Sequence, residues 1–525
     1  MIVNDTFESV RFSDSYFVGA GNFITFMVRG GGSGTVILES SRSGGLSWKE
    51  RHTLDGSDKT LSFEENIGQL YRIRCASYVS GTIRAQIVSD NGEKKESQND
   101  NKIAIIGTSL IQHNSIATAS RVSNWSRGVL AWAATLYRDI NYEVWHDVDD
   151  VNGRFFSGAN HGVSGETSTQ IISRLAAVKA MRPNYCIVDN GTNEMATRSY
   201  EEITSDTKTI YDELLSVGIT VIALPVLARE ISSWASGSET RKKAQKVNAW
   251  RRNYARKTNG VLFFDWNQGH VDPDNTDGEP YTGYSIDGIH YNPEGAFASG
   301  SRLKDFLASI VQAQQPAIVG QDDDYDASFN ELGNLFPNPM MVGTAGTNGT
   351  GSTGSVADSC RVERSSGTTV TVANTKETRG DSGSYQVLTF TPGGAAEETF
   401  LLRTSTANLG HTYATGDWVV AECDVDVSAY DGWKTIQLSL DDQGTDGING
   451  FSLEDFDSTG LQDFPKIAWA GRFRTPAFQI VSGSTDFRVR VETTIDGAIA
   501  GTPVLKVGSW RVSKIEDPRT AWGYV

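Results

Sequence analysis

The sequence is poor in cysteine and contains no long apolar run. The 525 residues include only four cysteines, Cys75, Cys186, Cys360 and Cys423, which are far apart and lack the paired spacing of zinc ligands. We expect each to be a buried free thiol. No segment approaches the roughly 20 apolar residues that a membrane-spanning helix needs, so we expect no membrane insertion. Residues 1–30 also lack the basic start, apolar run and cleavage site of a secretory signal.

Positive charge is scarce as well. The chain has 47 lysines and arginines against 64 aspartates and glutamates, a formal net charge of -17. Nucleic acid or an anionic membrane would be repelled unless a local basic patch intervened, and the sequence shows no such patch. We therefore expect no nucleic-acid partner. Glycine, in contrast, is abundant with 53 residues, which favours many turns and short strands.

The length predicts about three domains, and the first, residues 1–92, has an all-β pattern. In the segment 71–75 apolar residues alternate with arginines, and Ile83, Ala85 and Ile87 share one face of the next strand. Glycine clusters separate such runs, which is typical of a β-sandwich. The polar segment 90–101 is expected to be a linker.

Residues 102–315 alternate short apolar strands with helical segments, which predicts an α/β domain with a mostly parallel sheet covered by helices. The last helix should begin after Asn292, a plausible N-cap, with Pro293 in its first turn. The expected strands are 103–106, 185–188, 220–224 and 261–264, and the expected earlier helices are 125–138, 168–180, 200–217 and 239–257.

Residues 330–525 return to a β pattern after a second expected linker at 315–335. The segments 435–440 and 487–491 alternate cleanly, whereas 343–354 reads as a Gly/Thr/Ser loop. This pattern predicts a jelly-roll-like β-sandwich, which we expect to bind carbohydrate. The candidates for stacking on a glycan are Trp418, Trp433, Trp469 and Trp510.

The first strand of the α/β domain runs directly into Gly107-Thr108-Ser109-Leu110. Alone this is weak evidence, because a serine in this position often only caps a helix. Three further polar segments, 160–168, 189–194 and 287–290, also follow strands or begin helices. Since the carboxyl ends of parallel strands converge on one rim, the four segments can meet at a single cleft.

The residues in these segments meet the needs of acyl transfer. A serine hydroxyl requires a base, and His290 has an acidic partner, Asp287, three residues before it. The oxyanion of a tetrahedral intermediate requires donors, for which the N–H groups of Ser109 and Gly165 and the side-chain amide of Asn193 are suited. No Gly-x-Ser-x-Gly elbow follows a strand, which argues against an ordinary α/β-hydrolase.

The four segments resemble the four conserved blocks of the SGNH hydrolases, also called GDSL esterases, in their expected order. In this resemblance Ser109 matches the nucleophile, Gly165 and Asn193 match the glycine and asparagine of the middle blocks, and Asp287 with His290 match the final Asp-x-x-His. It implies a flavodoxin-like three-layer α/β/α domain that hydrolyses esters without a metal or organic cofactor. Thr108 and Glu194 depart from the family pattern, and we expect these differences to affect loop geometry.

Other patterns have a functional and an ordinary interpretation. Asp272, Asp274 and Asp277 before Gly278 resemble part of a calcium loop, as do Asp442, Asp446 and Gly447, but solvated turns are the favoured interpretation. His161 could line the substrate site, although a loop histidine without a chemical role is favoured. The spacing of Trp125 and Trp132 favours a core stripe on one helix.

The flanking β regions extend the prediction from esterase to carbohydrate deacetylase. The N-terminal region looks like β modules of bacteriophage virion proteins, and the segment 334–339 is similar to the start of phage tail carbohydrate-binding modules. The resemblance implies a tail fibre or tailspike enzyme, located in the virion, that removes O-acetyl groups from a bacterial surface polysaccharide. A secreted bacterial enzyme is the alternative location. A homotrimer attached to other tail proteins would follow by analogy. The alternatives are a catalytically silent receptor-binding tail protein and an SGNH lipase or thioesterase.

Overall fold

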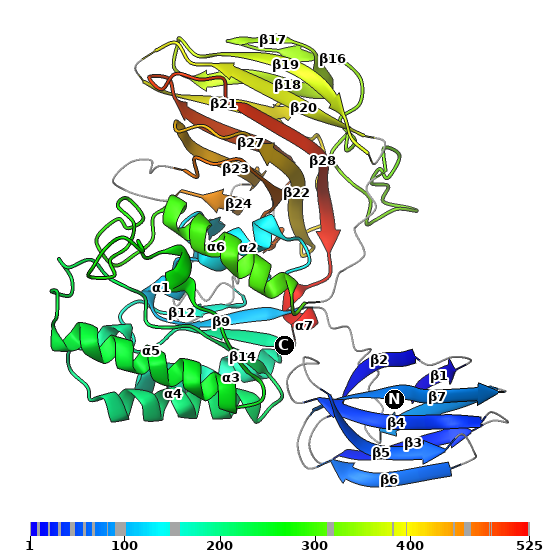
Figure 1. Cartoon of the computed structure of the whole chain (residues 1–525). Coiled ribbons are helices and arrows are strands. Elements are labelled where there is room, and N and C mark those ends of the chain that lie inside the picture. Colours follow the sequence, from blue (N-terminus) through cyan, green and yellow to red (C-terminus); the bar gives the residue numbers. More distant parts are fainter. Residues whose placement is uncertain are drawn as a thin grey trace.

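The computed structural model describes residues 101–146, 158–311 and 320–522, the last range with short gaps, together with the N-terminal strands between residues 2 and 89 (Figure 1). The gaps in the last range are 381–382, 395, 445–446, 456–463, 482 and 485. The linker expected at 90–101 lies outside the described residues except for Asn101.

A five-stranded parallel sheet forms the centre of the α/β region that follows the N-terminal strands. Its strands are buried along most of their length, as expected for a sheet covered on both faces. The strand order is β12-β9-β13-β14-β15, so the order in which the strands are added reverses at β9: within this sheet the chain passes from β9 to β12 on one side and then to β13 on the other. In such sheets the ligand crevice lies at the carboxyl ends of the strands beside this reversal. The bounds are β9 Ile103–Gly107, β12 Asn160–Gly162, β13 Tyr185–Val188, β14 Thr220–Ala223 and β15 Val261–Phe263.

Helices cover both faces of this sheet. Figure 1 shows α2 and α6 on the side facing the C-terminal strands, and α3, α4 and α5 on the opposite side. The side chain of Asn292 accepts a hydrogen bond from the N–H of Gly295 at 2.8 Å, so the predicted N-cap of the last helix is confirmed. The helices are α1 Ser109–Gln112, α2 Val129–Leu136, α3 Ser168–Met181, α4 Tyr200–Leu215, α5 Glu239–Lys257 and α6 Pro293–Ala308, with short 3-10 turns η1 Thr192–Glu194 and η2 Trp266–Gly269.

The helix expected over 125–138 is wrong in its first turn. Trp125 ends strand β11 (Arg121–Trp125), which forms a hairpin with β10 (Ser115–Thr118), and α2 begins only at Val129. The physical reason is long-range pairing, because β11 lies parallel to strand β24 (Asn449–Glu454) of the C-terminal region. Pairing with a strand more than 300 residues away outweighs the local sequence pattern, which favours a helix.

The C-terminal region contains two sheets of eight and seven strands. The hairpin β10-β11 from the α/β region completes the first sheet, in the order β10-β11-β24-β23-β27-β21-β18-β16. The second runs β17-β19-β20-β28-β22-β25, with β26 paired to β22. The bounds are β16 Ala345–Asn348, β17 Ser352–Gly354, β18 Val356–Ser366, β19 Thr371–Thr378, β20 Ser384–Thr391, β21 Glu397–Thr404, β22 Trp418–Val427, β23 Trp433–Asp442, β24 Asn449–Glu454, β25 Trp469–Arg474, β26 Phe478–Gln479, β27 Phe487–Asp496 and β28 Val504–Ile515, followed by α7 Pro518–Ala521.

Three expectations for this region are corrected. Trp418, Trp433, Trp469 and Trp510 are all buried, with no more than 6% of each residue exposed, so they fill the core and cannot stack on a glycan. The expected loop 343–354 contains β16 and β17. The described part of the expected linker, residues 320–335, packs on the sheets, since the N–H of Leu335 donates to the carbonyl of Val512 at 3.0 Å.

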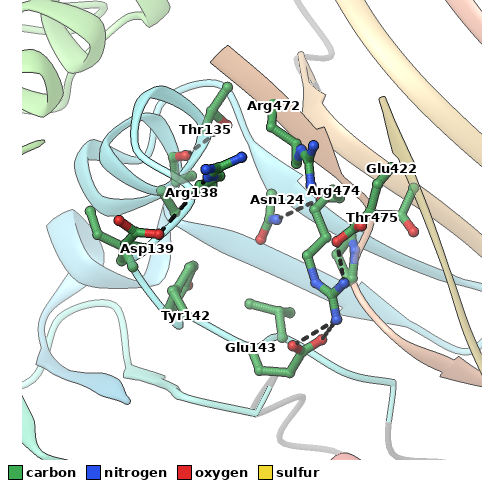
Figure 2. A pocket seen from close by; sticks show the side chains of 15 residues that line it. Asn124, Thr135, Arg138, Asp139, Tyr142, Glu143, Glu422, Arg472, Arg474 and Thr475 are labelled. Atoms are coloured by element: carbon green, nitrogen blue, oxygen red, sulfur yellow. Dashed lines mark hydrogen bonds and ion pairs between the residues drawn. The ribbon is translucent and has the colours of Figure 1, made fainter. Parts of the chain in front are cut away.

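The α/β region and the C-terminal region share one hydrophobic core. Trp132 on α2 contacts Trp469 and Phe464 of the C-terminal region, with ring centroids 5.2 and 5.3 Å apart. Beside this contact, a polar cavity of about 130 Å³ lies between α2 and the strands β22 and β25 (Figure 2). In it Arg474 binds both Glu143, at 3.1 Å, and Glu422, and thereby links the two regions.

The N-terminal region has a core of its own. Ten buried residues, among them Phe26, Leu38, Tyr71 and Ile73, form a cluster separate from the shared core. The predicted inward positions of Ile83, Ala85 and Ile87 are confirmed. The sheets are β1-β8-β3-β6 and β2-β7-β4-β5, with bounds β1 Ile2–Phe7, β2 Arg11–Val18, β3 Asn22–Arg29, β4 Ser33–Ser41, β5 Lys49–Asp55, β6 Lys59–Glu65, β7 Gln69–Ser80 and β8 Ile83–Ser89.

Two predictions from composition can be compared with the structure. All four cysteines are buried and none of them is part of a disulfide, as expected. None of the helices in the described ranges combines the length and apolar character needed to cross a bilayer.

Candidate active site

Ser109 lies at the carboxyl end of the central strand. Strand β9 ends at Gly107, and Ser109 opens the short helix α1, so its hydroxyl stands on the rim beside the point where the strand order reverses. The residue is buried, with 6% of its surface exposed. The local fold therefore places a shielded hydroxyl where this class of sheet binds ligands.

His290 and Asp287 form a hydrogen-bonded chain with this hydroxyl. The Nε2 atom of His290 lies 2.8 Å from Oγ of Ser109, and its Nδ1 atom lies 2.7 Å from Oδ2 of Asp287. Residues separated by 181 positions thus meet at hydrogen-bonding distance. With Nδ1–H donating to Asp287, Nε2 is the acceptor that can take the proton of Ser109.

The turn before His290 keeps Asp287 in its carboxylate form. Burial alone would raise the pKa of Asp287, but hydrogen bonds from the backbone and imidazole of His290 and from the N–H of Ile289 hold this pKa below its ordinary value. Gly288 within the turn has φ +80°, a left-handed conformation that suits glycine. The carboxylate therefore stays charged and can stabilise an imidazolium.

The three predicted oxyanion donors come from the ends of three strands. Ser109 follows β9, Gly165 follows β12 and Asn193 follows β13. The Nδ2 atom of Asn193 donates one hydrogen to the carbonyl of Glu166 at 2.9 Å, which fixes the amide and leaves its second hydrogen available. Gly165 has φ +79° and open space beside it, so backbone conformation, not crowding, accounts for glycine there.

The two departures from the family pattern have structural partners. The hydroxyl of Thr108 donates to Oδ2 of the buried Asp189 at 2.6 Å, which anchors the residue before Ser109 to the neighbouring strand end. Burial raises the pKa of Asp189. Glu194 is fully buried, accepts hydrogen bonds from the N–H and hydroxyl of Ser168 at the start of α3, and pairs with Arg198. Both residues thus shape the loops of the site.

Sequence reasoning missed an aromatic wall behind His290. The ring of His113 lies 4.8 Å from that of His290 and 4.8 Å from that of Trp125, measured between centroids. Burial lowers the pKa of His113 to about 3, and the nearby His290 adds to this effect, so His113 is neutral at ordinary pH. Its position four residues after Ser109, one helical turn away, was the available signal.

Other predicted candidates lie away from the site. His161 is buried on β12 with Nε2 3.0 Å from Sδ of Met181, which agrees with the favoured interpretation that it has no chemical role. Trp132 is in the core as predicted, whereas Trp125 belongs to the wall just described.

The two acidic loops are held by local contacts. The carboxylate of Asp272 accepts from the N–H of Asp274, and Asp277 accepts from Ser236. Asp442 accepts from the N–H of Gly444, while Asp446 lies outside the described residues. Within the described part of the chain, no group of three or more histidine, cysteine, aspartate or glutamate residues is arranged to hold a metal ion.

This geometry can be compared with known proteins. Residues 114–296 match the model of the GDSL-like lipase/acylhydrolase family, a span that includes Gly165, Asn193, Asp287 and His290 and begins five residues after Ser109. None of the curated proteins compared with the chain matches it.

Several solved structures are similar to 40% of this chain. One is a GDSL-like lipase from Bacteroides thetaiotaomicron, with 18% identity, coverage of 40% of this chain and 89% of that one, and a TM-score of 0.30. Another is a carbohydrate esterase of family 3 from Talaromyces cellulolyticus, with 16% identity, 40% and 97% coverage and a TM-score of 0.29. A third is a psychrotrophic esterase from Pseudoalteromonas, with 14% identity, 40% and 97% coverage and a TM-score of 0.28.

The family match covers four of the five strands of the parallel sheet, β12, β13, β14 and β15, and the loops that carry four of the residues described above. The chain therefore carries a GDSL-like lipase/acylhydrolase domain, the domain type also called SGNH.

Proposed function

We propose that this protein is a serine esterase in which Ser109, His290 and Asp287 are the catalytic residues. The observation that carries the proposal is the hydrogen-bonded chain from Ser109 Oγ through His290 to Asp287, with distances of 2.8 and 2.7 Å. Nucleophile, base and orienting carboxylate are thereby placed in the geometry that acyl transfer requires.

The reaction proceeds in two steps. In the first, His290 Nε2 takes the proton of Ser109 as Oγ attacks the ester carbonyl, and the same proton passes to the leaving alkoxide as the C–O bond breaks. In the second, water attacks the acyl-serine and gives a proton to His290, and His290 passes this proton to Oγ of Ser109 as the bond between Oγ and the acyl carbon breaks and the carboxylic acid leaves. The N–H groups of Ser109 and Gly165 and the amide of Asn193 stabilise the oxyanion in both steps, and each is worth about 3 kcal/mol of barrier.

We further propose that the ester is an O-acetyl group on a bacterial surface polysaccharide. The support is the pair of strand-rich regions flanking the hydrolase domain, an arrangement suited to holding a long polymer near the site. A two-sheet, jelly-roll-like architecture would suit the C-terminal region to this role. The resemblance of residues 1–92 and 334–339 to phage modules supports a location in the virion tail, as a trimer attached to other tail proteins.

Acetate release tests the proposal directly. The protein is incubated with O-acetylated polysaccharides beside a Ser109→Ala variant, and acetate is measured enzymatically. We expect release by the unaltered protein and a loss of at least about a thousandfold in the variant. Equal acetate from both proteins would refute the assignment of Ser109.

Chain-length preference separates a deacetylase from a lipase or thioesterase. Rates on nitrophenyl acetate and on nitrophenyl esters of long acyl chains are compared, and we expect the acetate ester to be preferred. Labelling of Ser109 by a fluorophosphonate probe tests the silent-receptor alternative, which requires the probe to leave this residue unmodified.

A further inference from the structure

A large hollow lies on the same rim of the sheet as Ser109. It has a volume of about 600 Å³ and is formed at the carboxyl ends of β14 and β15 by the loops 225–234 and 271–281 together with residues of α5 and α6. A second hollow of about 460 Å³ adjoins it and shares Arg252, Asp265, Gln268 and Arg302. The two adjoining hollows together are called the groove below.

The side chains that line the groove carry charge of the opposite sign to the net charge of the chain. Four arginines, Arg229, Arg241, Arg252 and Arg302, line the larger hollow, against one carboxylate, Asp265. The whole chain has a formal charge of -17, so this concentration of guanidinium groups is a local exception. The sequence did not reveal it, because the four arginines are spread over 73 positions and meet only in the fold. A basic groove on an acidic protein attracts anions to one place.

Two of the four arginines, Arg241 and Arg302, have neutral hydrogen-bond partners, whereas Arg229 also interacts electrostatically with the carboxylates of Asp189 and Asp287. Among the described residues, Arg252 is the only one of the four in an ion pair with a carboxylate, at 2.9 Å from Asp265. The guanidinium of Arg241 donates to three backbone carbonyls, including that of Arg229 at 2.9 Å. Arg302 reaches the neutral side chain of Gln268 at 3.5 Å. The neutral partners of Arg241 and Arg302 hold these two side chains in place and leave their positive charge available.

Arg229 connects the groove with the active site. Its Nη2 atom donates to the hydroxyl of Thr192 at 2.7 Å, directly before Asn193. The next residue, Glu230, donates its N–H to the carbonyl of Gly288 in the turn that precedes His290, at 3.1 Å. Tyr281 also lines the hollow and is 37% exposed, which offers an aromatic face to a sugar ring. A polymer chain in the groove would therefore lie beside the reacting residues.

We propose that this groove binds anionic groups of the substrate polymer, so that the esterase acts on an acidic O-acetylated polysaccharide. The proposal rests on the esterase function proposed above and adds the substrate class to it. Arginine binds carboxylates of uronic acids and phosphate diesters through the same paired donors, and either group would serve in the groove.

The first test uses a matched pair of polymers. Polygalacturonate is chemically O-acetylated, and half of it is then carboxyl-reduced, which yields a neutral polymer with the same linkage. A phosphodiester-linked O-acetylated glycan forms the third arm. We expect kcat/KM for acetate release to be at least about tenfold higher on one of the anionic polymers than on the neutral one, and this preference to shrink with added salt. The better anionic polymer identifies the anion. Equal rates on all three polymers would overturn the proposal.

The second test uses single substitutions. Arg252→Gln and Arg302→Gln are each expected to raise KM for the anionic polymer about threefold to tenfold. Arg256→Gln is the matched control, because Arg256 is exposed on the same helix as Arg252 and does not line the groove. Asp305→Asn removes an exposed carboxylate from the smaller hollow and should lower KM for this polymer. An equal rise in KM for Arg256→Gln would show that the groove has no special role.

Binding separates failure of this inference from failure of the esterase proposal. Calorimetric titration of oligogalacturonate and of a phosphodiester-linked oligomer into the Ser109→Ala protein measures the groove without catalysis. Arginine-dependent binding without acetate release in the unaltered protein would retain the groove and reject the deacetylase. Acetate release without selectivity for anionic polymers, and without arginine-dependent binding, would retain the esterase and reject the groove.

Discussion

The two strand-rich regions that flank the hydrolase domain differ in how they are joined to it. The N-terminal region has a separate core, and the chain reaches the hydrolase domain through residues 90–100. The C-terminal region shares one continuous core with the hydrolase domain and takes the hairpin β10-β11 into its eight-stranded sheet. Similar β patterns in sequence therefore conceal an appended unit at one end and a structural part of the enzyme at the other.

The shared sheet continues to the active site. Trp125 ends β11, which pairs with β24, and its ring contacts His113, which contacts His290. Arg121 and Ser123 on β11 both bind the carboxylate of Glu454 on β24. The C-terminal sheet thus fixes the strand that supports the wall behind the imidazole of His290, whereas none of the buried residues that form the described N-terminal core belongs to this wall.

Deletion of each region should give the largest contrast. Removal of residues 320–525 would expose the shared core around Trp132 and leave β11 without its partner, so we expect insoluble or unfolded protein without esterase activity. Removal of residues 1–100 should leave a folded protein with an unchanged rate on nitrophenyl acetate. Soluble yield, thermal unfolding and hydrolysis rates are the measurements. A soluble, active protein without residues 320–525 would contradict the comparison.

Two matched glycine substitutions probe the same contrast with a single methyl group. A Cβ at Gly471 on β25 would collide with the carbonyl oxygen of Thr135 on α2, and a Cβ at Gly34 would collide with that of Ser77 inside the N-terminal region. Such overpacking costs about 1–3 kcal/mol of unfolding free energy. Urea unfolding and esterase assays should show that Gly471→Ala lowers stability and activity together, while Gly34→Ala destabilises the protein but retains full activity. Loss of activity in Gly34→Ala would show unexpected coupling.

Acid should destabilise the hydrolase domain through its buried histidines. Burial lowers the pKa of His113, His161 and His270 to about 3, against 6.5 in the unfolded chain. Between these values the unfolded state binds protons that the folded state does not, so the free energy of unfolding falls as pH falls from 6.5 towards 3. Each histidine contributes up to about 1.4 kcal/mol per pH unit.

A variant isolates one of these contributions. His161→Gln removes a titrating group that lies away from the active site, and urea unfolding at pH 7, 6 and 5 should show a shallower loss of stability than in the unaltered protein. His52→Gln in the N-terminal region is the control, because its imidazole is partly exposed and its pKa is lowered less. Parallel pH profiles for His161→Gln and the unaltered protein would refute the assignment.

The sequence predicted those features that depend on local pattern. The helices α3, α5 and α6 begin at the expected residues because serine, threonine and asparagine caps precede them, and the buried strands of the sheet follow from their apolar runs. The strand ends then place Ser109, Gly165 and Asn193 on one rim. The proximity of Ser109 to His290 could be expected on this ground, but only the structure supplies the distance of 2.8 Å.

The features that the sequence did not predict depend on contacts between distant segments. Trp125 was predicted to lie in a helix, because the residues around it give no sign that this segment pairs with the distant strand β24. Trp433 and Trp510 were candidates for glycan stacking but are buried, because alternation shows that one face of a strand is buried and does not show which residues a second sheet covers. The arginines of the groove meet through the fold alone, so the net charge gave no warning of a basic surface.

The smallest effect should come from His113, through which the C-terminal sheet reaches the catalytic imidazole. His113→Ala removes the ring that packs against His290, so we expect kcat on nitrophenyl acetate to fall about tenfold, or about 1.4 kcal/mol of barrier, with KM nearly unchanged. His113→Phe keeps a ring in contact and should restore most of the rate, because the wall acts by position. His52→Ala makes the same change in the N-terminal region and should leave kcat unaltered. If His113→Phe were as slow as His113→Ala, a ring nitrogen of His113 would be required, and packing against the C-terminal strand pair would not explain the effect.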